Sequence, residues 1–287
     1  MNKRYDSSET WDLIIKPQKG FFVDLQLQEV WNYRELIYLF IRRNFVTYYK
    51  QTLLGPLWYL ITPFVTTVVF TLIFGKLAKI PTDGIPPFLF YMAGNITWSY
   101  FATSFRGTSN TFVVNAAIFG KVYFPRLTVP ISEVVIGLLK FTIHLVLFAG
   151  FYMYFAYKGS SAHLTIWIFY FPFIIIQMAL LSLGMGIIVS SLTTKYRDLT
   201  FLMTFGLQLW MYGTPIIYPA SLVPDKYLCL YMMNPMAPII ETSRYAFLGE
   251  GLVDPAYISV SWGITLFSLI AGVLLFNKVE KTFMDTV

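Results

Sequence analysis

The stretch that decides the fold covers residues 48–58 and reads YYKQTLLGPLW. Before it, residues 31–50 alternate apolar and charged side chains with a helical period, whereas residues 53–75 contain no charged side chain. Gly55 tolerates backbone conformations that other residues avoid, and Pro56 suits the first turn of a helix. The pattern therefore predicts an amphipathic helix at the membrane surface that turns here into a membrane-spanning helix.

The composition is that of an integral membrane protein. Of the 287 residues, 56% are hydrophobic and 13% are charged, and the mean hydropathy is +0.61. Soluble domains carry about 25% charged residues. The net charge of +6 fits the Lys and Arg that membrane proteins concentrate on their cytoplasmic side, and it gives no reason to expect nucleic acid. With Cys229 as the single cysteine, the chain has no disulfide framework and no cysteine-rich metal site.

Six segments reach the roughly 20 apolar residues that a transmembrane helix needs. They are residues 53–75, 88–112, 131–157, 164–192, 199–218 and 257–277. The predicted fold class is an all-α integral membrane protein with six transmembrane helices. The six-span domain covers residues 53–287. It is preceded by an amphipathic interfacial helix over 31–52 and by an arm over 1–30, which is too polar for a cleaved signal peptide.

The basic residues predict the orientation of the chain. One set of loops and flanks holds Arg34, Arg42, Arg43, Lys50, Lys121, Arg126, Lys195, Arg197, Lys278 and Lys281. The opposite set holds Lys76, Lys79, Lys158, Lys226 and Arg244. Because Lys and Arg are more frequent in cytoplasmic loops, we expect both termini and the arm in the cytoplasm.

Two connecting segments are too apolar for solvated loops. Residues 115–128 hold a short helical run followed by a proline and basic residues, so we expect this segment to pack against something. Residues 219–256 hold prolines between apolar runs, and the runs 228–233 and 236–248 are too short to cross a bilayer. These runs predict re-entrant or interfacial helices between the fifth and sixth spans, shielded by protein or lining a wet cavity.

The sequence proposes no catalytic or metal centre. It lacks the G-x-x-x-x-G-K-[ST] phosphate loop, and its two histidines, His144 and His163, form no recognisable zinc or Ser-His-Asp pattern.

The third predicted span holds three ionisable residues, Glu133, Lys140 and His144. Their spacings of seven and four place all three on one stripe of a helix. Ionisable groups inside a membrane usually face the bundle interior and often serve a function. Two hypotheses stay open: a proton relay, as in a secondary transporter, or a structural polar pair.

Aromatic residues gather in the first and fifth predicted spans. They are Trp58, Tyr59, Phe64, Phe70 and Phe74, and then Phe201, Phe205, Trp210 and Tyr212. Bulky lipid-facing side chains and interfacial belts explain such residues singly. As a group they also suit the passage of a glycan, because sugar rings stack their C–H faces on aromatic planes.

The chain resembles the membrane subunits of ABC-2 type exporters for polysaccharides, the O-antigen and teichoic acid class. The resemblance rests on segments in matching order over most of the chain: residues 11–20, WNYRE (31–35), YKQTLLGPLW (49–58), KVYFPR (121–126), YRD (196–198), YGTPIIYP (212–219), NP (234–235) and EKTFMD (280–285). The YKQT entry is more similar to O-antigen exporters of Gram-negative bacteria than to teichoic acid exporters.

This resemblance implies an ABC-2, or type V exporter, fold in the bacterial inner membrane. It implies a homodimer paired with two copies of a separate ATPase, so that ATP and Mg²⁺ belong to the partner and this chain is neither an enzyme nor a cofactor-binding protein. The implied cargo is an undecaprenyl-pyrophosphate-linked polysaccharide, most closely O-antigen. A permease for teichoic acid, capsule or drugs stays open, as do a proton-driven carrier and a membrane glycan polymerase or ligase, for which Glu241, Arg244 and Glu250 offer a sparse outer cluster.

The resemblance also implies roles for individual residues. The helix 31–52 becomes a gate helix whose Arg42, Arg43 and Lys50 face lipid phosphate. The channel is lined by Trp58, Tyr59, Phe70, Phe74, Phe201, Trp210 and Tyr212. The ATPase docks on the coupling segment 115–128 and its surroundings, through Ile118, Lys121, Tyr123, Phe124, Arg126, Tyr196, Arg197 and Asp198. Residues 219–256 form the re-entrant outer region.

Overall fold

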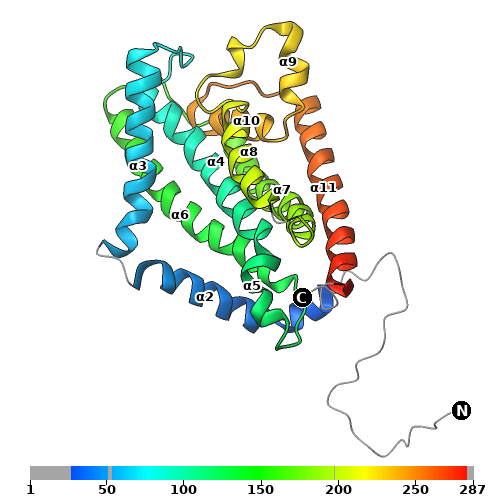
Figure 1. Cartoon of the computed structure of the whole chain (residues 1–287). Helices are drawn as coiled ribbons and strands as arrows, with labels where there is room; N and C mark the ends of the chain where they lie inside the picture. Colours follow the sequence, from blue (N-terminus) through cyan, green and yellow to red (C-terminus); the bar gives the residue numbers. More distant parts are fainter. Residues whose placement is uncertain (1–26, 51–53, 197, 283–287) are drawn as a thin grey trace, which may run out of the picture.

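The computed structural model describes residues 27–50, 54–196 and 198–282, and every regular element within these ranges is helical. Helix α1, Leu27–Asn32, leads into α2, Arg34–Lys50, which lies across the lower end of the bundle in Figure 1. Residues 1–26 of the predicted arm, 1–30, lie outside the described residues.

The chain turns between α2 and α3, as the sequence predicts. Gly55 adopts a φ of +50°, and a 3-10 turn over Gly55–Leu57 carries Pro56 in its first turn. Helix α3, Trp58–Phe70, then runs along the bundle and continues as a π-helical segment, Thr71–Leu77. Glycine is suited to this position because its backbone reaches positive φ without a steric penalty.

The remaining helices follow in chain order. They are α4, Pro87–Ser109; α5, Thr111–Phe119; α6, Thr128–Tyr157; the 3-10 turn Ile166–Tyr170; α7, Phe171–Thr193; α8, Leu199–Tyr212; the 3-10 turn Ala220–Leu222; α9, Asp225–Met232; α10, Met236–Leu248; and α11, Pro255–Thr282. Figure 1 places α2 and α5 at one end of the bundle and α9 at the other. We call these the α5 end and the α9 end.

Among the described residues, four helical segments are long and apolar enough to cross a membrane. They are Gly55–Leu77, Thr128–Tyr157, Ile166–Thr193 and Pro255–Glu280. The second predicted span, 88–112, is not among these four, because α4 is rich in polar residues. The fifth, 199–218, is not among them because α8 is an apolar helix of only 14 residues. The all-helical membrane architecture is confirmed, whereas the count of six spans and the re-entrant arrangement remain predictions.

Helix α8 ends at Tyr212, before Gly213 and Pro215, and Asn234 satisfies the polar groups of this end. The Asn234 Nδ2 donates to the Gly213 carbonyl oxygen at 2.9 Å and to Thr214 Oγ1 at 3.0 Å. Its Oδ1 accepts from Trp210 Nε1 at 2.8 Å and from the backbone N–H of Met236, at the start of α10. One side chain thus satisfies polar groups at the end of α8 and at the beginning of α10.

Helix α4 lies at the centre of the bundle. It packs against α3, α6, α7 and α10, and sixteen of its 23 residues are buried. Their apolar side chains, with those of α6, α7 and α10, make the main core. Three hydroxyls of α4, those of Thr97, Thr108 and Ser109, bond to its own backbone, and Thr97 Oγ1 donates to the Ala93 carbonyl oxygen at 2.8 Å. Such bonds satisfy polar side chains inside an apolar bundle.

Helices α7 and α11 approach each other at two glycines. A Cβ atom added at Gly184 would lie 2.6 Å from the backbone nitrogen of Leu269, and one added at Gly272 would lie 2.5 Å from the Gly184 carbonyl oxygen. Small residues at such crossings let helix backbones pack closely in membranes. The two backbones therefore leave no room for a side chain.

Replacing Gly272 by Ala should separate α7 from α11 and destabilise the protein by about 1–3 kcal/mol, the usual cost of overpacking. The measurement is the apparent Tm of the purified protein in detergent. Gly263→Ala, on the same helix α11, is the matched control, because a Cβ atom added at Gly263 would have no neighbouring atom within 4 Å. An equal Tm for the two variants would contradict the close packing.

Candidate functional site

Aromatic rings join helix α2 to the segment 115–128 at the α5 end. The ring centroid of Phe40 in α2 lies 5.9 Å from that of Phe124, and Phe124 lies 5.7 Å from Phe119. Phe112 of α5 stacks on Phe276 of α11 at 4.7 Å. All five rings are buried in one cluster. The segment 115–128 is therefore packed against its own chain, and its helix α5 begins earlier than expected, at Thr111.

A second group of side chains in and beside this segment points outward. Val114 is 74% exposed and Tyr123 is 68% exposed, and Lys121 and Val122 are also exposed. An exposed apolar patch of this kind is typical of a protein contact surface. Of the residues expected to contact an ATPase, Lys121 and Tyr123 thus lie on the surface, and Ile118 is half-buried.

Phe124 and Arg126 are engaged within the chain. The Arg126 Nη1 donates to the backbone carbonyl oxygen of Glu280 at 2.7 Å, and its Nε lies 3.9 Å from the Glu280 carboxylate. Phe124 is 5% exposed. These two residues hold the segment 115–128 in place, which the sequence did not reveal because Glu280 lies 154 residues further along.

The segment after α7 reaches the same end of the bundle. The backbone N–H of Phe112 donates to Ser190 Oγ at 3.3 Å, which brings the start of α5 against the last turns of α7. Beyond α7, Tyr196 is half-exposed and Asp198 is exposed at the start of α8. Arg197 lies outside the described residues.

Helix α2 has two different faces. Phe40 and Phe45 face the bundle, where the Phe45 ring stacks on Tyr59 at 5.9 Å. Arg42 and Arg43 are exposed, together with Tyr38. This exposed face combines cations with an aromatic ring, as interfacial helices do. The side chain of Lys50, the third predicted phosphate ligand, lies outside the described residues.

The predicted channel aromatics separate into two groups. Trp58 is 42% exposed, Phe201 is 82% exposed and Tyr212 is 48% exposed. The other four pack inside this chain. They are Tyr59, which stacks on Phe45; Phe70 and Phe74, which meet Tyr91; and Trp210, which meets Trp98, Phe101 and Phe105. Of these four, Tyr59 is buried and the other three are half-buried, so the first group presents the more accessible rings.

The three ionisable residues of α6 face α2 and α3, and Lys140 interacts electrostatically with both Glu133 and His144. Glu133 Oε1 accepts a hydrogen bond of 2.8 Å from Asn44 Nδ2, across the contact between α2 and α6. The Nζ of Lys140 lies 5.7 Å from the centre of the Tyr59 ring, and His144 is buried. Sequence reasoning singled out Glu133 and overlooked its partner Asn44, which stands between an arginine and a phenylalanine in a helix predicted as amphipathic.

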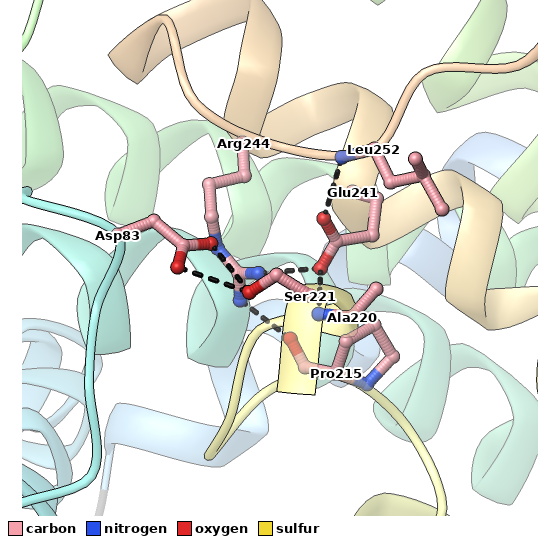
Figure 2. A network of polar contacts seen from close by, with 7 residues as sticks. All are labelled: Asp83, Pro215, Ala220, Ser221, Glu241, Arg244 and Leu252. Carbon is pink, nitrogen blue, oxygen red and sulfur yellow. Dashed lines mark hydrogen bonds and ion pairs between the residues drawn. The ribbon is translucent and has the colours of Figure 1, made fainter. Parts of the chain in front are cut away.

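The α9 end contains a buried polar network, shown in Figure 2. Arg244 Nη1 donates to Glu241 Oε1 at 2.7 Å, and both side chains are at most 2% exposed. Arg244 also donates to the Pro215 carbonyl oxygen and places its guanidinium 3.8 Å from the centre of the Phe90 ring in α4. Burial lowers the pKa of Arg244, and the neighbouring charge of Glu241 opposes this shift.

Glu241 completes the network by accepting bonds from two backbone groups. Its Oε2 accepts from the N–H of Leu252 at 2.9 Å, and its Oε1 accepts from the N–H of Ala220 at 3.4 Å. Nearby, Ser221 Oγ donates to the Asp83 carboxylate at 3.0 Å, which joins the loop before α4 to the same region (Figure 2). The pair thus organises loops and is closed to a substrate, so burial argues against a catalytic role for Glu241 and Arg244.

Comparison with known proteins gives a consistent result. The model of the ABC-2 type transporter family matches residues 35–248. Two proteins from Klebsiella pneumoniae, each named O-antigen export system permease protein RfbA, are 28% and 27% identical over 88% of this chain and 94% of their own length. A protein of the same name from Myxococcus xanthus is 25% identical over 91% of this chain and 98% of its own length.

Replacing Arg244 by Met should leave the buried Glu241 without its cation, which costs about 3–5 kcal/mol. We expect a clearly lower apparent Tm in detergent. Lys226→Met on α9 is the control, because Lys226 is an exposed cation of the same region. Combining Arg244→Met with Glu241→Gln should recover part of the loss, since no unpaired charge remains. A wild-type Tm for Arg244→Met would show that the network does not hold the α9 end.

Proposed function

The chain belongs to the ABC-2 type transporter family, and on that premise we propose that it is the permease subunit of an ATP-driven exporter of lipid-linked polysaccharide, of the O-antigen class. The observation that carries this proposal is the similarity to three O-antigen export permeases over nearly the whole of each chain. The helical membrane architecture supports it.

A separate ATPase would dock on the exposed patch of Lys121, Val122 and Tyr123, which we place on the cytoplasmic side. The absence of a phosphate loop from this sequence supports a partner as the source of ATP hydrolysis, with Mg²⁺ held there. The buried Phe124 and the Arg126–Glu280 contact support a rigid docking segment, because an ATPase can transmit force only to a segment that is packed against the bundle.

The glycan would pass between two copies of this chain. Trp58, Phe201 and Tyr212 expose their rings and are the residues that we propose to contact sugars. Arg42 and Arg43 on the exposed face of α2 are the proposed contacts for the phosphates of the undecaprenyl carrier, because guanidinium groups bind phosphate well. Teichoic acid, capsule or another lipid-linked polymer would use the same fold with a different cargo.

The test is co-expression with a phosphate-loop ATPase of the same organism, purification, and ATP hydrolysis in lipid with and without lipid-linked glycan. We expect a complex of two permeases and two ATPases whose hydrolysis rises with the glycan. An ATPase that lacks the phosphate-loop lysine is the control. Failure of any ATPase to associate would overturn the exporter function.

Tyr123→Ala should weaken the association with the ATPase while leaving the Tm of the permease unchanged, because this side chain is exposed. Phe124→Ala, one residue further, removes a buried ring and should cost about 3–5 kcal/mol of stability. Co-purification and thermal unfolding of the two variants measure both effects. If Tyr123→Ala and Phe124→Ala changed co-purification and Tm to the same extent, the proposed docking surface would be contradicted.

A further inference from the structure

Helices α3 and α6 leave a groove between them on the surface of the bundle. It has a volume of about 460 Å³ and is lined by Leu60, Val146, Leu147, Gly150, Phe151 and Tyr154. None of these six side chains is charged, and the Tyr154 hydroxyl is the only polar side-chain group among them. Since both helices belong to segments that are long and apolar enough to cross a membrane, the groove faces the bilayer.

A glycine in the middle of this stretch of α6 provides the space. A Cβ atom added at Gly150 would have no atom within 4 Å, so a side chain at this position would project into the groove. Aromatic contacts hold the neighbouring wall in place. The Phe151 ring stacks on Phe64 of α3 with centroids 5.7 Å apart, and its centroid lies 4.8 Å from that of Phe88 in α4. The groove is thus a recess with a fixed wall.

The end of α6 shows at which depth of the membrane the groove lies. Tyr154 and Tyr157 stand in the last turn of the helix and are 51% and 93% exposed, and tyrosines are enriched at the level of the lipid headgroups. Val146 lies eight residues before Tyr154, which is about 12 Å along a helix. One leaflet of the hydrocarbon core is about 15 Å thick. The groove therefore follows the path of an acyl chain through most of one leaflet.

A cation stands at the headgroup end of the groove. Lys158 directly follows α6 and is exposed, and its Nζ lies 4.7 Å from the centre of the Tyr154 ring, which lines the groove. The helix dipole favours a cation at this end of α6 with or without a ligand. The contact with Tyr154, however, places the ammonium beside the groove. Neither ion pair found among the described residues involves Lys158, so none of their carboxylates neutralises it.

We propose that this groove binds an acyl chain of an anionic phospholipid and that Lys158 binds the phosphate of the same lipid. An apolar recess with a cation at one end matches an amphiphile with an apolar tail and an anionic head. An undecaprenyl chain also has an anionic head, but it is far longer than a groove that covers one leaflet. The inference goes beyond the proposed export function, since it requires only that α3 and α6 lie in a membrane.

The test uses the full-length protein in nanodiscs that contain phosphatidylglycerol and phosphatidylcholine in equal amounts, with a photoreactive diazirine in the acyl chain of one of the two. Mass spectrometry locates the labelled peptides. We expect phosphatidylglycerol to label residues 146–154 about five times more strongly than phosphatidylcholine does, the ratio that corresponds to about 1 kcal/mol for one basic residue near anionic lipid. Equal labelling by the two lipids would overturn the inference.

The role of Lys158 is tested by removing its charge. Lys158→Gln should lower the labelling ratio from about five to about one, because the apolar groove alone does not distinguish the two headgroups. Lys226→Gln is the matched control. Lys226 is also exposed at the α9 end, and its Nζ lies 5.5 Å from the centre of the Tyr227 ring, but neither residue lines the groove. A wild-type ratio in Lys158→Gln would contradict the assignment of the phosphate to this residue.

The acyl chain is tested by filling the groove. Gly150→Leu should reduce the labelling of the peptide that holds Leu60 by both lipids, while the Tm stays unchanged because the added Cβ meets no atom. Gly263→Leu on α11 is the control, since a Cβ atom added at Gly263 also has no atom within 4 Å. Wild-type labelling in Gly150→Leu would place the lipid elsewhere. Should Gly150→Leu unfold, the ratio measured with Lys158→Gln still decides.

Two other occupants give different results. Loss of the label on addition of undecaprenyl phosphate, but not of unlabelled phosphatidylglycerol, would assign the groove to the carrier lipid and overturn the proposal. A groove without label in the wild type, together with conversion of a dimer to a monomer by Gly150→Leu in size-exclusion chromatography, would assign it to a second copy of the chain. The labelling needs neither ATPase nor glycan, so its outcome is independent of the outcome for the export function.

Discussion

Helix α4 is enclosed by α3, α6, α7 and α10, and a helix in that position has to satisfy every polar group that it brings with it. It meets part of this demand with the hydroxyls of Thr97, Thr108 and Ser109, which bond to its own backbone, and it admits charged neighbours at glycines. Gly94 admits the Arg244 guanidinium, 3.3 Å from where a Cβ would stand, and Gly107 admits the Glu133 carboxylate. The Arg244 guanidinium and the Glu133 carboxylate thus both depend on missing side chains in α4, one toward each end.

Much of the architecture could be predicted because hydropathy and backbone chemistry are local. The turn at Gly55 and Pro56 follows from two residues, and the helix Met236–Leu248 matches the run predicted between prolines. The end of α8 has a local signal in Gly213 and Pro215, whereas the bonds of Asn234 could not be predicted, because they reach residues 20 to 24 positions earlier. Hydropathy alone continues that helix to residue 218.

The candidate site was harder to predict than the fold. Between Lys121 and Arg126 the chain has no helical or strand period, so the sequence gives no rule for which side chains point outward. The structure exposes Lys121 and Tyr123 and buries Phe124. The importance of Asn44 is likewise invisible in a pattern of apolar and polar residues, since it depends on a carboxylate 89 positions away.

The contact between Arg126 and Glu280 depends mainly on the side chain of Arg126 and on the backbone of Glu280. The shorter bond, 2.7 Å, ends on the backbone carbonyl oxygen of Glu280, which any residue at position 280 would also supply. The Glu280 carboxylate accepts from the backbone N–H of Arg126 at 3.4 Å and lies 3.9 Å from Arg126 Nε. Position 126 therefore has to keep a long, multi-donor side chain, whereas the shortest bond asks of position 280 only that the last turn of α11 keeps its path.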